Sequence, residues 1–323
     1  MNNVIAVVGP TAVGKTSLSF SLAAYFKTEL ISCDAYQIYK GMNIGTAKPT
    51  ARQLATYTHH LIDIAEPGEA YSAAAFQAMA AEKIEQLQER HKLPILVGGT
   101  GLYIQSLLEG YAFAAKRVSQ TERAHAETLV KTLSAAELQA YIVRNTEWEP
   151  PDWHEFLANT HRLIRLVAAI EAGEGRTAAV PVKKRSSVYD AYVIGLTLPR
   201  HVMYERIERR IDSMLEQGWV DEVRRLLRQG VHRDCQAMKA IGYEELAAYL
   251  SGETALAAAV DTIKTRTRRF AKRQLTWYRR MPYIHWYEKN TFSTEAALAS
   301  RVISDIESYY KSPATERCAC SVN

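Results

Sequence analysis

The residues best suited to chemistry stand near the first residue of the chain, in a glycine-rich segment that ends in lysine and threonine. The segment reads GPTAVGKT and fits the pattern Gly-x-x-x-x-Gly-Lys-Thr. Its glycines allow successive backbone N–H groups to face an anion, the lysine reaches the outer phosphates, and the threonine hydroxyl is a ligand for Mg²⁺. The pattern predicts a phosphate-binding loop made of Gly9, Thr11, Ala12, Val13, Gly14, Lys15 and Thr16, with Thr16 also holding the metal.

The second chemical group is the carboxylate of Asp34, which ends an apolar run from Glu29. The ends of parallel strands meet at a ligand crevice, so Asp34 is expected near the bound phosphates. A phosphate-loop hydrolase carries a further Asp after a later strand, to hold magnesium and help activate water. Here Gly98, Gly99 and Thr100 take that place. This absence weakens the interpretation as a nucleotide hydrolase.

The elements that position these groups alternate between strand and helix patterns. Apolar runs at Val4–Val8, Leu93–Val97 and Ala191–Leu196 read as buried strands, and Ser72–His91 reads as a helix capped by Ser72. We therefore expect an α/β fold, with a P-loop NTPase-like parallel sheet core, helices on both faces and a helical insertion domain.

The change to a mostly helical pattern after residue 111 predicts the domain limits. Residues 1–111 form the first part of the core, 112–187 the helical insertion, 188–311 the rest of the core with basic helices, and 312–323 a flexible tail. Within the insertion the pattern favours three helices: Thr121–Thr132, Ala135–Val143 and Asn159–Ala172.

Positive charge gathers in the last third of the chain. Two basic amphipathic helices are expected at 202–217 and 220–229, with Arg206 and Arg210 on one face. Residues 262–281 hold eight Lys or Arg, no acid and interleaved aromatic side chains. That mixture suits a phosphate backbone with stacked bases, so the segment favours a nucleic-acid partner.

Composition limits the other classes of protein. The 323 residues carry a net charge of +5, with a pI near 8.9, which permits a nucleic-acid partner without requiring one. Four cysteines without metal-ligand spacing suit a reducing cytosol. Since no signal peptide and no run of 18 apolar residues is found, we expect a cytoplasmic protein without a membrane partner.

Taken together, these segments resemble the tRNA dimethylallyltransferases, which attach an isopentenyl group to the adenosine next to the anticodon. The match covers nearly the whole chain, and its phosphate loop followed by DxxQxYxGMxIGTAKP is highly specific. The blocks are GPTAVGKT, ISCDAYQIYKGMNIGTAKP, HHLID, LVGGTGLY, the spaced Asn159, Arg162 and Arg165, RIERRIDSML, AIGYEEL and AKRQLTWYRR. The resemblance is to the bacterial form, since the zinc-finger tail of eukaryotic members is not found, and it implies a monomer.

The resemblance also implies roles for single residues. The loop would hold dimethylallyl diphosphate with Mg²⁺, Arg210 and Thr100 would help neutralise the leaving diphosphate, and Asp34 would accept a proton from the adenine amine. Catalytic positions would then be Asp34, Thr100 and Arg210. Contacts to the tRNA anticodon stem-loop are implied for Asp34, Ala35, Tyr36, Gln37, Thr100, Arg123, Arg162, Arg165, Lys239, Gly242, Tyr243 and Arg273.

Three departures from the family pattern stand at Ala35, Ala75 and Ala168, where members usually have Ser, a carboxylate and a different helix sequence. Other interpretations of the residues stay open. An adenylate isopentenyltransferase acting on free AMP or ATP would not need the insertion or the basic helix. A small-molecule kinase with an ATP-binding loop would not need the DxxQxY block, and a non-catalytic RNA-binding protein would not need Lys15, Thr16 or Asp34.

Overall fold

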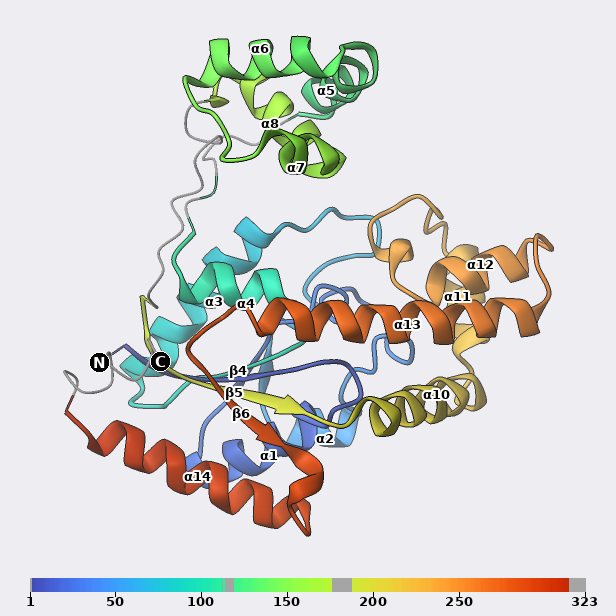
Figure 1. The fold of residues 1–323 in the computed structure, drawn as a ribbon. Coiled ribbons are helices and arrows are strands. Elements are labelled where there is room, and N and C mark those ends of the chain that lie inside the picture. Colours follow the sequence, from blue (N-terminus) through green and yellow to red (C-terminus); the bar gives the residue numbers. More distant parts are fainter. Residues whose placement is uncertain (1, 112, 114–118, 176–187, 314–323) are drawn as a thin grey trace. The chain divides into compact units, whose positions relative to one another are not determined.

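The computed structural model describes residues 2–111, 113, 119–175 and 188–313 (Figure 1). The chain divides into two compact units, Met1–Leu108 with Ser187–Asn323, and Glu109–Ser186. No helix among the described residues is long and apolar enough to cross a bilayer.

A parallel sheet of six strands forms the centre of the first unit, in the order β3-β2-β4-β1-β5-β6. Its central strand β1 pairs with β4 on one side and with β5 on the other. The strands are β1 (Asn3–Val8), β2 (Leu30–Ser32), β3 (His59–His60), β4 (Ile95–Val97), β5 (Asp190–Thr197) and β6 (Ile284–Glu288).

Helices cover both faces of this sheet, as expected for an α/β fold. Alternate side chains of a strand point to opposite faces. Accordingly Ile5 and Val7 join one buried cluster, with residues of α1 and α10, whereas Val4, Ala6 and Val8 join another, with residues of α3 and α4. The helices of this unit are α1 (Lys15–Phe26), α2 (Ala51–Thr56), α3 (Ala73–Glu89), α4 (Gly101–Leu108), α10 (Arg200–Glu216), α11 (Trp219–Arg228), α12 (Tyr243–Leu250), α13 (Leu256–Tyr278) and α14 (Glu295–Lys311), with 3₁₀ turns at Ala237–Lys239 and Lys289–Thr291. The predicted fold class is confirmed.

The second unit is a separate helical bundle with its own apolar core. Two of its helices begin with a Ser-x-x-Glu capping box, in which Ser119 pairs with Glu122 and Ser134 with Glu137. Its buried cluster comprises Ala126, Leu138, Ile142, Phe156, Leu163, Leu166, Val167 and Ala168. The helices are α5 (Gln120–Thr132), α6 (Ala135–Thr146), α7 (Trp153–Ala158) and α8 (Thr160–Glu171).

Most predicted elements of the core are found with shifted ends. Ser72 caps α3 by accepting a hydrogen bond from the N–H of Ala75, as the sequence predicts. The elements that were not predicted include α2, α4, α7, α12, β6 and α14; α7 follows the Pro150-Pro151 interruption. Residues 314–323 of the predicted tail, and residues 176–187 of the Gly/Arg/Lys-rich segment, lie outside the described residues.

Candidate active site

The phosphate loop joins the end of β1 to the start of α1 and takes a backbone path that needs glycine. Gly9 and Gly14 have φ values of 141° and 102°, a region that side chains disfavour. A Cβ on Gly9 would lie 2.6 Å from the carbonyl oxygen of Leu196 on the neighbouring strand. The loop therefore ends at the N-terminus of α1, where unpaired N–H groups attract an anion.

Lys15 folds back over this loop. Its Nζ donates to the carbonyl oxygens of Gly9 and Pro10, at 2.9 and 2.8 Å. Burial, and then the charge of Arg210, lowers the pKa of Lys15 to about 7, while Asp34 opposes the shift. Because burial has removed water from this ammonium, a bound anion would stabilise its charged form.

Asp34 lies just beyond β2 and shapes its own turn. Its Oδ1 accepts the N–H groups of Tyr36 at 2.9 Å and Gln37 at 3.3 Å, whereas Oδ2 takes no hydrogen bond from the described part of the chain. Thr100 supports the same turn, because its hydroxyl accepts the N–H of Ala35 at 3.0 Å. One carboxylate oxygen is thus fixed and the other is available to a substrate.

The loop after Asp34 is held by groups from distant segments. Gln37 Nε2 donates to the carbonyls of Thr46 and Ala47, at 3.2 and 3.3 Å. The carboxylate of Glu222 on α11 is buried and accepts the N–H groups of residues 43 to 45 and the Tyr243 hydroxyl. This carboxylate replaces the water that the loop amides would otherwise need.

The burial of Tyr243 contradicts the RNA contact that the family resemblance implies for its side chain. Its side chain is fully buried, its hydroxyl lies 2.6 Å from Glu222 Oε1, and the neighbouring Gly242 is buried too. Trp219 fills the space that a Cβ on Gly242 would need. Both residues position the loop and leave no side chain at the surface for RNA.

Replacing Glu222 by alanine is expected to lower the free energy of unfolding by about 3 kcal/mol, since several buried N–H groups lose their acceptor. Urea denaturation measures it. Tyr243→Phe, which removes only one donor, should cost about 1 kcal/mol. Equal losses for the two variants would contradict the role of Glu222 as the central acceptor.

Gln274 on α13 links the phosphate loop to the glycine turn after β4, a role the sequence analysis did not find. Its Oε1 accepts the N–H of Thr11 at 2.9 Å, and its Nε2 donates to the carbonyl of Gly99 at 2.7 Å. The N–H of Thr11 already has an acceptor in Gln274, so the predicted contact of this N–H with a phosphate is corrected. The signal was the AKRQLTWYRR block, whose uncharged glutamine stands among cations.

Gln274→Ala should raise KM for the phosphorylated substrate, because both loops lose their common tie, and should cost about 1–2 kcal/mol of stability. Steady-state kinetics and thermal unfolding test this prediction. Gln274→Glu keeps the acceptor for Thr11 but not the donor to Gly99, so its KM and its stability should lie between those of the alanine variant and wild type. An unchanged KM in the alanine variant would contradict the proposed link between the two loops.

One cavity of about 910 Å³ opens over the phosphate loop. Most of the site residues predicted in the α/β unit line it. Lys15, Asp34 and Arg210 line it and lie close enough for their charges to act on one another. Its apolar lining comes largely from α1, α10 and α11, through Phe20, Ile207, Ile211, Met214 and Trp219. The predicted residues that line it are Thr11, Ala12, Gly14, Lys15, Thr16, Asp34, Tyr36, Gln37, Arg210, Lys239 and Arg273, whereas Gly9, Val13, Ala35, Thr100, Gly242 and Tyr243 do not. Val13 is fully buried, so its side chain is not available to a ligand.

The basic helix α13 is less unbalanced than its sequence indicates. Arg266 pairs with Glu244 and Glu245, Arg268 pairs with Glu208, and Lys264 lies 2.6 Å from Asp212. The expectation of eight uncompensated cations is therefore wrong, because acids from α10 and α12 pack against this helix. Arg273 lines the cavity, with its guanidinium 5.8 Å from the ring centre of Phe270.

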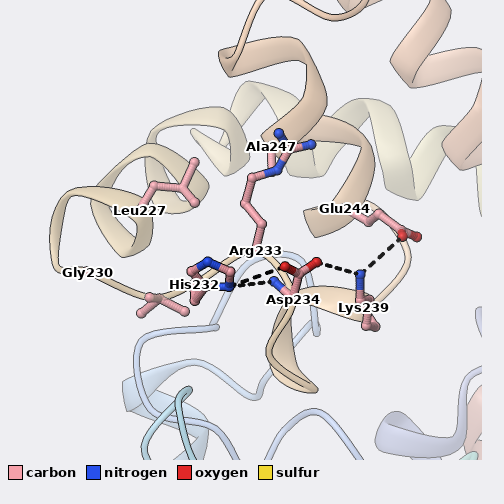
Figure 2. Close-up of a pocket in the computed structure, with 9 residues that line it drawn as sticks. Leu227, Gly230, His232, Arg233, Asp234, Lys239, Glu244 and Ala247 are labelled. Carbon is pink, nitrogen blue, oxygen red and sulfur yellow. Dashed lines mark hydrogen bonds and ion pairs between the residues drawn. The ribbon is translucent and has the colours of Figure 1, made fainter. Parts of the chain in front are cut away.

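A second cavity, of about 550 Å³, is also lined by Lys239, which it shares with the first. Lys239 Nζ lies 3.5 Å from Asp234 and 3.8 Å from Glu244, and the Asp234 carboxylate also faces His232 (Figure 2). Lys239 thus lines the main cavity while its ammonium pairs with the carboxylates of Asp234 and Glu244.

The three arginines predicted in the insertion all lie on the helical unit. Arg123 on α5 lies 3.4 Å from Glu127, and the Arg162 guanidinium on α8 lies 4.7 Å from the ring centre of Phe156. Burial, and then the charge of Arg162, lowers the pKa of Arg165. Arg162 and Arg165 stand three residues apart on α8 and form one positive site on this unit.

The parallel sheet, the glycine loop that opens α1 and the added helical bundle define an α/β protein of P-loop-like fold. A family model described as IPP transferase matches residues 37–281. The chain belongs to the IPP transferase family.

Individual relatives agree with this assignment. The chain is 44% identical to a tRNA dimethylallyltransferase of Bacillus velezensis, over 88% of this chain and 90% of that protein. It is 43% identical to the tRNA dimethylallyltransferase of Bacillus subtilis, over 89% and 92% of the two chains. Among solved structures, the full-length tRNA isopentenylpyrophosphate transferase of Bacillus halodurans is similar, with a TM-score of 0.71, 38% identity, and 95% and 96% of the two chains covered.

Proposed function

We propose that this protein transfers a dimethylallyl group from dimethylallyl diphosphate to a tRNA. The acceptor is the exocyclic amine of the adenosine on the 3′ side of the anticodon, in tRNAs that read codons starting with U, and diphosphate is released. The observation that carries the proposal is that one cavity is lined both by the charged groups of Lys15, Arg210 and Asp34 and by a set of apolar side chains. The relatives named above support the same reaction.

The cations at the loop serve the leaving diphosphate. Negative charge builds on it as the allylic C–O bond breaks, so fixed positive groups stabilise the transition state more than the bound substrate. Lys15 folds over the loop, and Arg206 and Arg210 on α10 line the same cavity. Burial lowers the pKa of Arg210, which marks a guanidinium partly removed from water.

Thr16 fits the proposed Mg²⁺. Its side chain is exposed in the cavity at the start of α1, and its hydroxyl makes no hydrogen bond within the described part of the chain. Mg²⁺ is commonly held by few protein oxygens together with substrate phosphates and waters, and a single hydroxyl at this place fits that donor set. When bound, the ion would neutralise phosphate charge.

The apolar wall suits the five-carbon prenyl group. Ile207, Ile211 and Met214 follow one face of α10, and Phe20 and Trp219 complete the wall. A branched hydrocarbon gains from leaving water in such a compartment, and the wall keeps water from an allylic carbon that would otherwise react with it.

Asp34 is proposed as the group that orients the adenine amine and takes its proton. Its available oxygen, Oδ2, belongs to a side chain that lines the cavity, at a turn that Thr100 and two backbone N–H groups fix. The target base must leave its stack to reach this carboxylate, as other base-modifying enzymes require. Tyr36, Lys239 and Arg273 line the same cavity and are proposed to contact the RNA.

The arginines of the helical unit are proposed to bind the anticodon arm. Arg162 and Arg165 present adjacent guanidinium groups, which suit phosphate oxygens. Arg123 completes the proposed set. We further propose that the protein acts in the cytoplasm as a monomer.

The reaction is tested by offering radiolabelled dimethylallyl diphosphate and Mg²⁺ to the protein with an unmodified anticodon stem-loop and AMP in the same assay. Label on the RNA alone supports the proposal. Label on AMP would assign the protein to the adenylate isopentenyltransferases. No label on either, with consumption of added ATP, would indicate a kinase.

A further inference from the structure

Lys289 and Glu295 form an ion pair, called here the charged bridge, that contacts Ser17 beside the phosphate loop. The proposed reaction does not use this bridge. Glu295, in the first turn of α14, accepts a hydrogen bond from the Ser17 hydroxyl. The same carboxylate lies 2.5 Å from the Nζ of Lys289, which follows β6. Lys289 is nearly buried and its Nζ would lie 2.5 Å from a Cβ on Gly14. The bridge therefore touches both Gly14 and the first turn of α1.

The place of the bridge matters for any ligand with a longer phosphate chain. In a nucleotide bound to such a loop, the outer phosphates reach the lysine, and the inner phosphate with its sugar continues along the first turn of the helix. Ser17 stands one residue beyond Thr16 and lines the cavity. An inner phosphate at Ser17 would therefore lie beside the hydroxyl that the Glu295 carboxylate holds.

The carboxylate keeps its charge at neutral pH. The hydrogen bond from Lys289, and then that from Ser17, lowers the pKa of Glu295, and the charge of Arg206 acts in the same direction. A carboxylate next to a phosphate repels it, and in an interface such like-charge contacts are strongly unfavourable.

We propose that Glu295 makes the phosphate loop selective for diphosphates whose ester end points toward Asp34, and excludes nucleotides, whose inner phosphate and sugar would extend past Ser17. Lys289 positions the carboxylate and packs against Gly14. The inference rests on the proposed function, because it assumes that the loop holds a diphosphate. It assigns a basis for selectivity to residues that do not take part in the transfer itself.

The test is calorimetric titration of inorganic diphosphate and of ADP, each with Mg²⁺, into the full-length protein and its variants. Wild type should bind diphosphate more tightly than ADP. Glu295→Gln keeps the size of the side chain and removes its charge, so ADP affinity should rise about tenfold, with diphosphate affinity changing less than about threefold. Glu295→Ala should give the same gain for ADP by also opening the space.

Glu307→Gln is the matched control. Glu307 stands on the same helix α14 and accepts a hydrogen bond from Tyr25 on α1, at 2.7 Å, so it joins the same two helices away from the loop. This variant should leave both affinities unchanged. A general loosening of the two helices would change the affinities for both ligands by the same factor, whereas the proposal requires a change in the ratio of the two affinities.

Two results would overturn the inference alone: equal binding of ADP and diphosphate by wild type, or an unchanged ratio in both Glu295 variants while diphosphate still binds. Failure of wild type to bind diphosphate would overturn the proposed function, and the inference with it.

Discussion

Asp34→Asn is expected to lower the rate of dimethylallyl transfer by about 10²–10⁴-fold, the contribution typical of a positioned general base. The amide retains an oxygen that can accept the N–H groups of Tyr36 and Gln37, so the turn after β2 is kept. What is lost is the charge and basicity at Oδ2. Single-turnover transfer to an unmodified anticodon stem-loop measures the rate without interference from product release.

Binding of inorganic diphosphate by Asp34→Asn should stay within about threefold of wild type, because the loop and its cations are untouched. Asp34→Ala is a less specific variant, since it also removes the acceptor that holds Tyr36. Glu66→Gln, which alters an exposed pair with Lys40, serves as a control for removal of a carboxylate. Transfer by Asp34→Asn at the wild-type rate would exclude Asp34 as the base.

Lys15→Met is expected to weaken diphosphate binding at least about 30-fold, the lower end of the cost of removing one partner of a buried charge pair. The methionine keeps an unbranched side chain over the loop but provides no positive charge. Calorimetric titration of the full-length protein gives the affinity, and circular dichroism confirms that the variant is folded. Diphosphate binding as tight as in wild type would exclude Lys15 as the phosphate ligand.

The lowered pKa of Lys15 predicts how this binding depends on pH. With a pKa of about 7, Lys15 loses its proton in the free protein as pH rises above 7. A bound diphosphate raises that pKa, so the complex keeps the proton that the free protein has lost. Affinity should therefore fall as pH rises from about 7, and binding at pH 8 should take up protons.

Lys15→Met separates this effect from titration of the ligand itself. Titrations in buffers of different ionisation enthalpy should show less proton uptake for Lys15→Met than for wild type at pH 8. The same proton uptake in both proteins would assign the whole pH dependence to the ligand.

The local elements of the site were predictable because their signals lie within short segments. An apolar run followed by GPTAVGKT predicts a strand, a loop and a helix. Its two glycines have positive φ values, which other residues rarely adopt, so their spacing in the sequence indicates the shape of the loop. Ser72 before α3 is another such signal. By contrast β6, with the sequence IHWYE, shows no clean alternation, because its neighbours on both faces decide which of its side chains are buried.

The partners of charged side chains were not predictable, because they come from elsewhere in the chain. The run of cations in α13 suggested a free basic surface, yet Arg266 and Arg268 pair with acids on α12 and α10. Glu222 appeared to be one acid among several on an amphipathic helix and is in fact buried beneath the amides of residues 43 to 45. Sequence reports the sign of a charge, whereas its environment depends on packing.

The sequence alone determined the phosphate loop, the carboxylate of Asp34, the alternating core and the helical insertion, because each depends on the types and spacing of neighbouring residues. Only the tertiary structure decided that Gln274 ties two loops together, that Tyr243 is buried, and that Glu295 faces Ser17. Ser17 and Glu295 are 278 positions apart. No local pattern records such a contact, because it exists only once the sheet has brought α1 and α14 together.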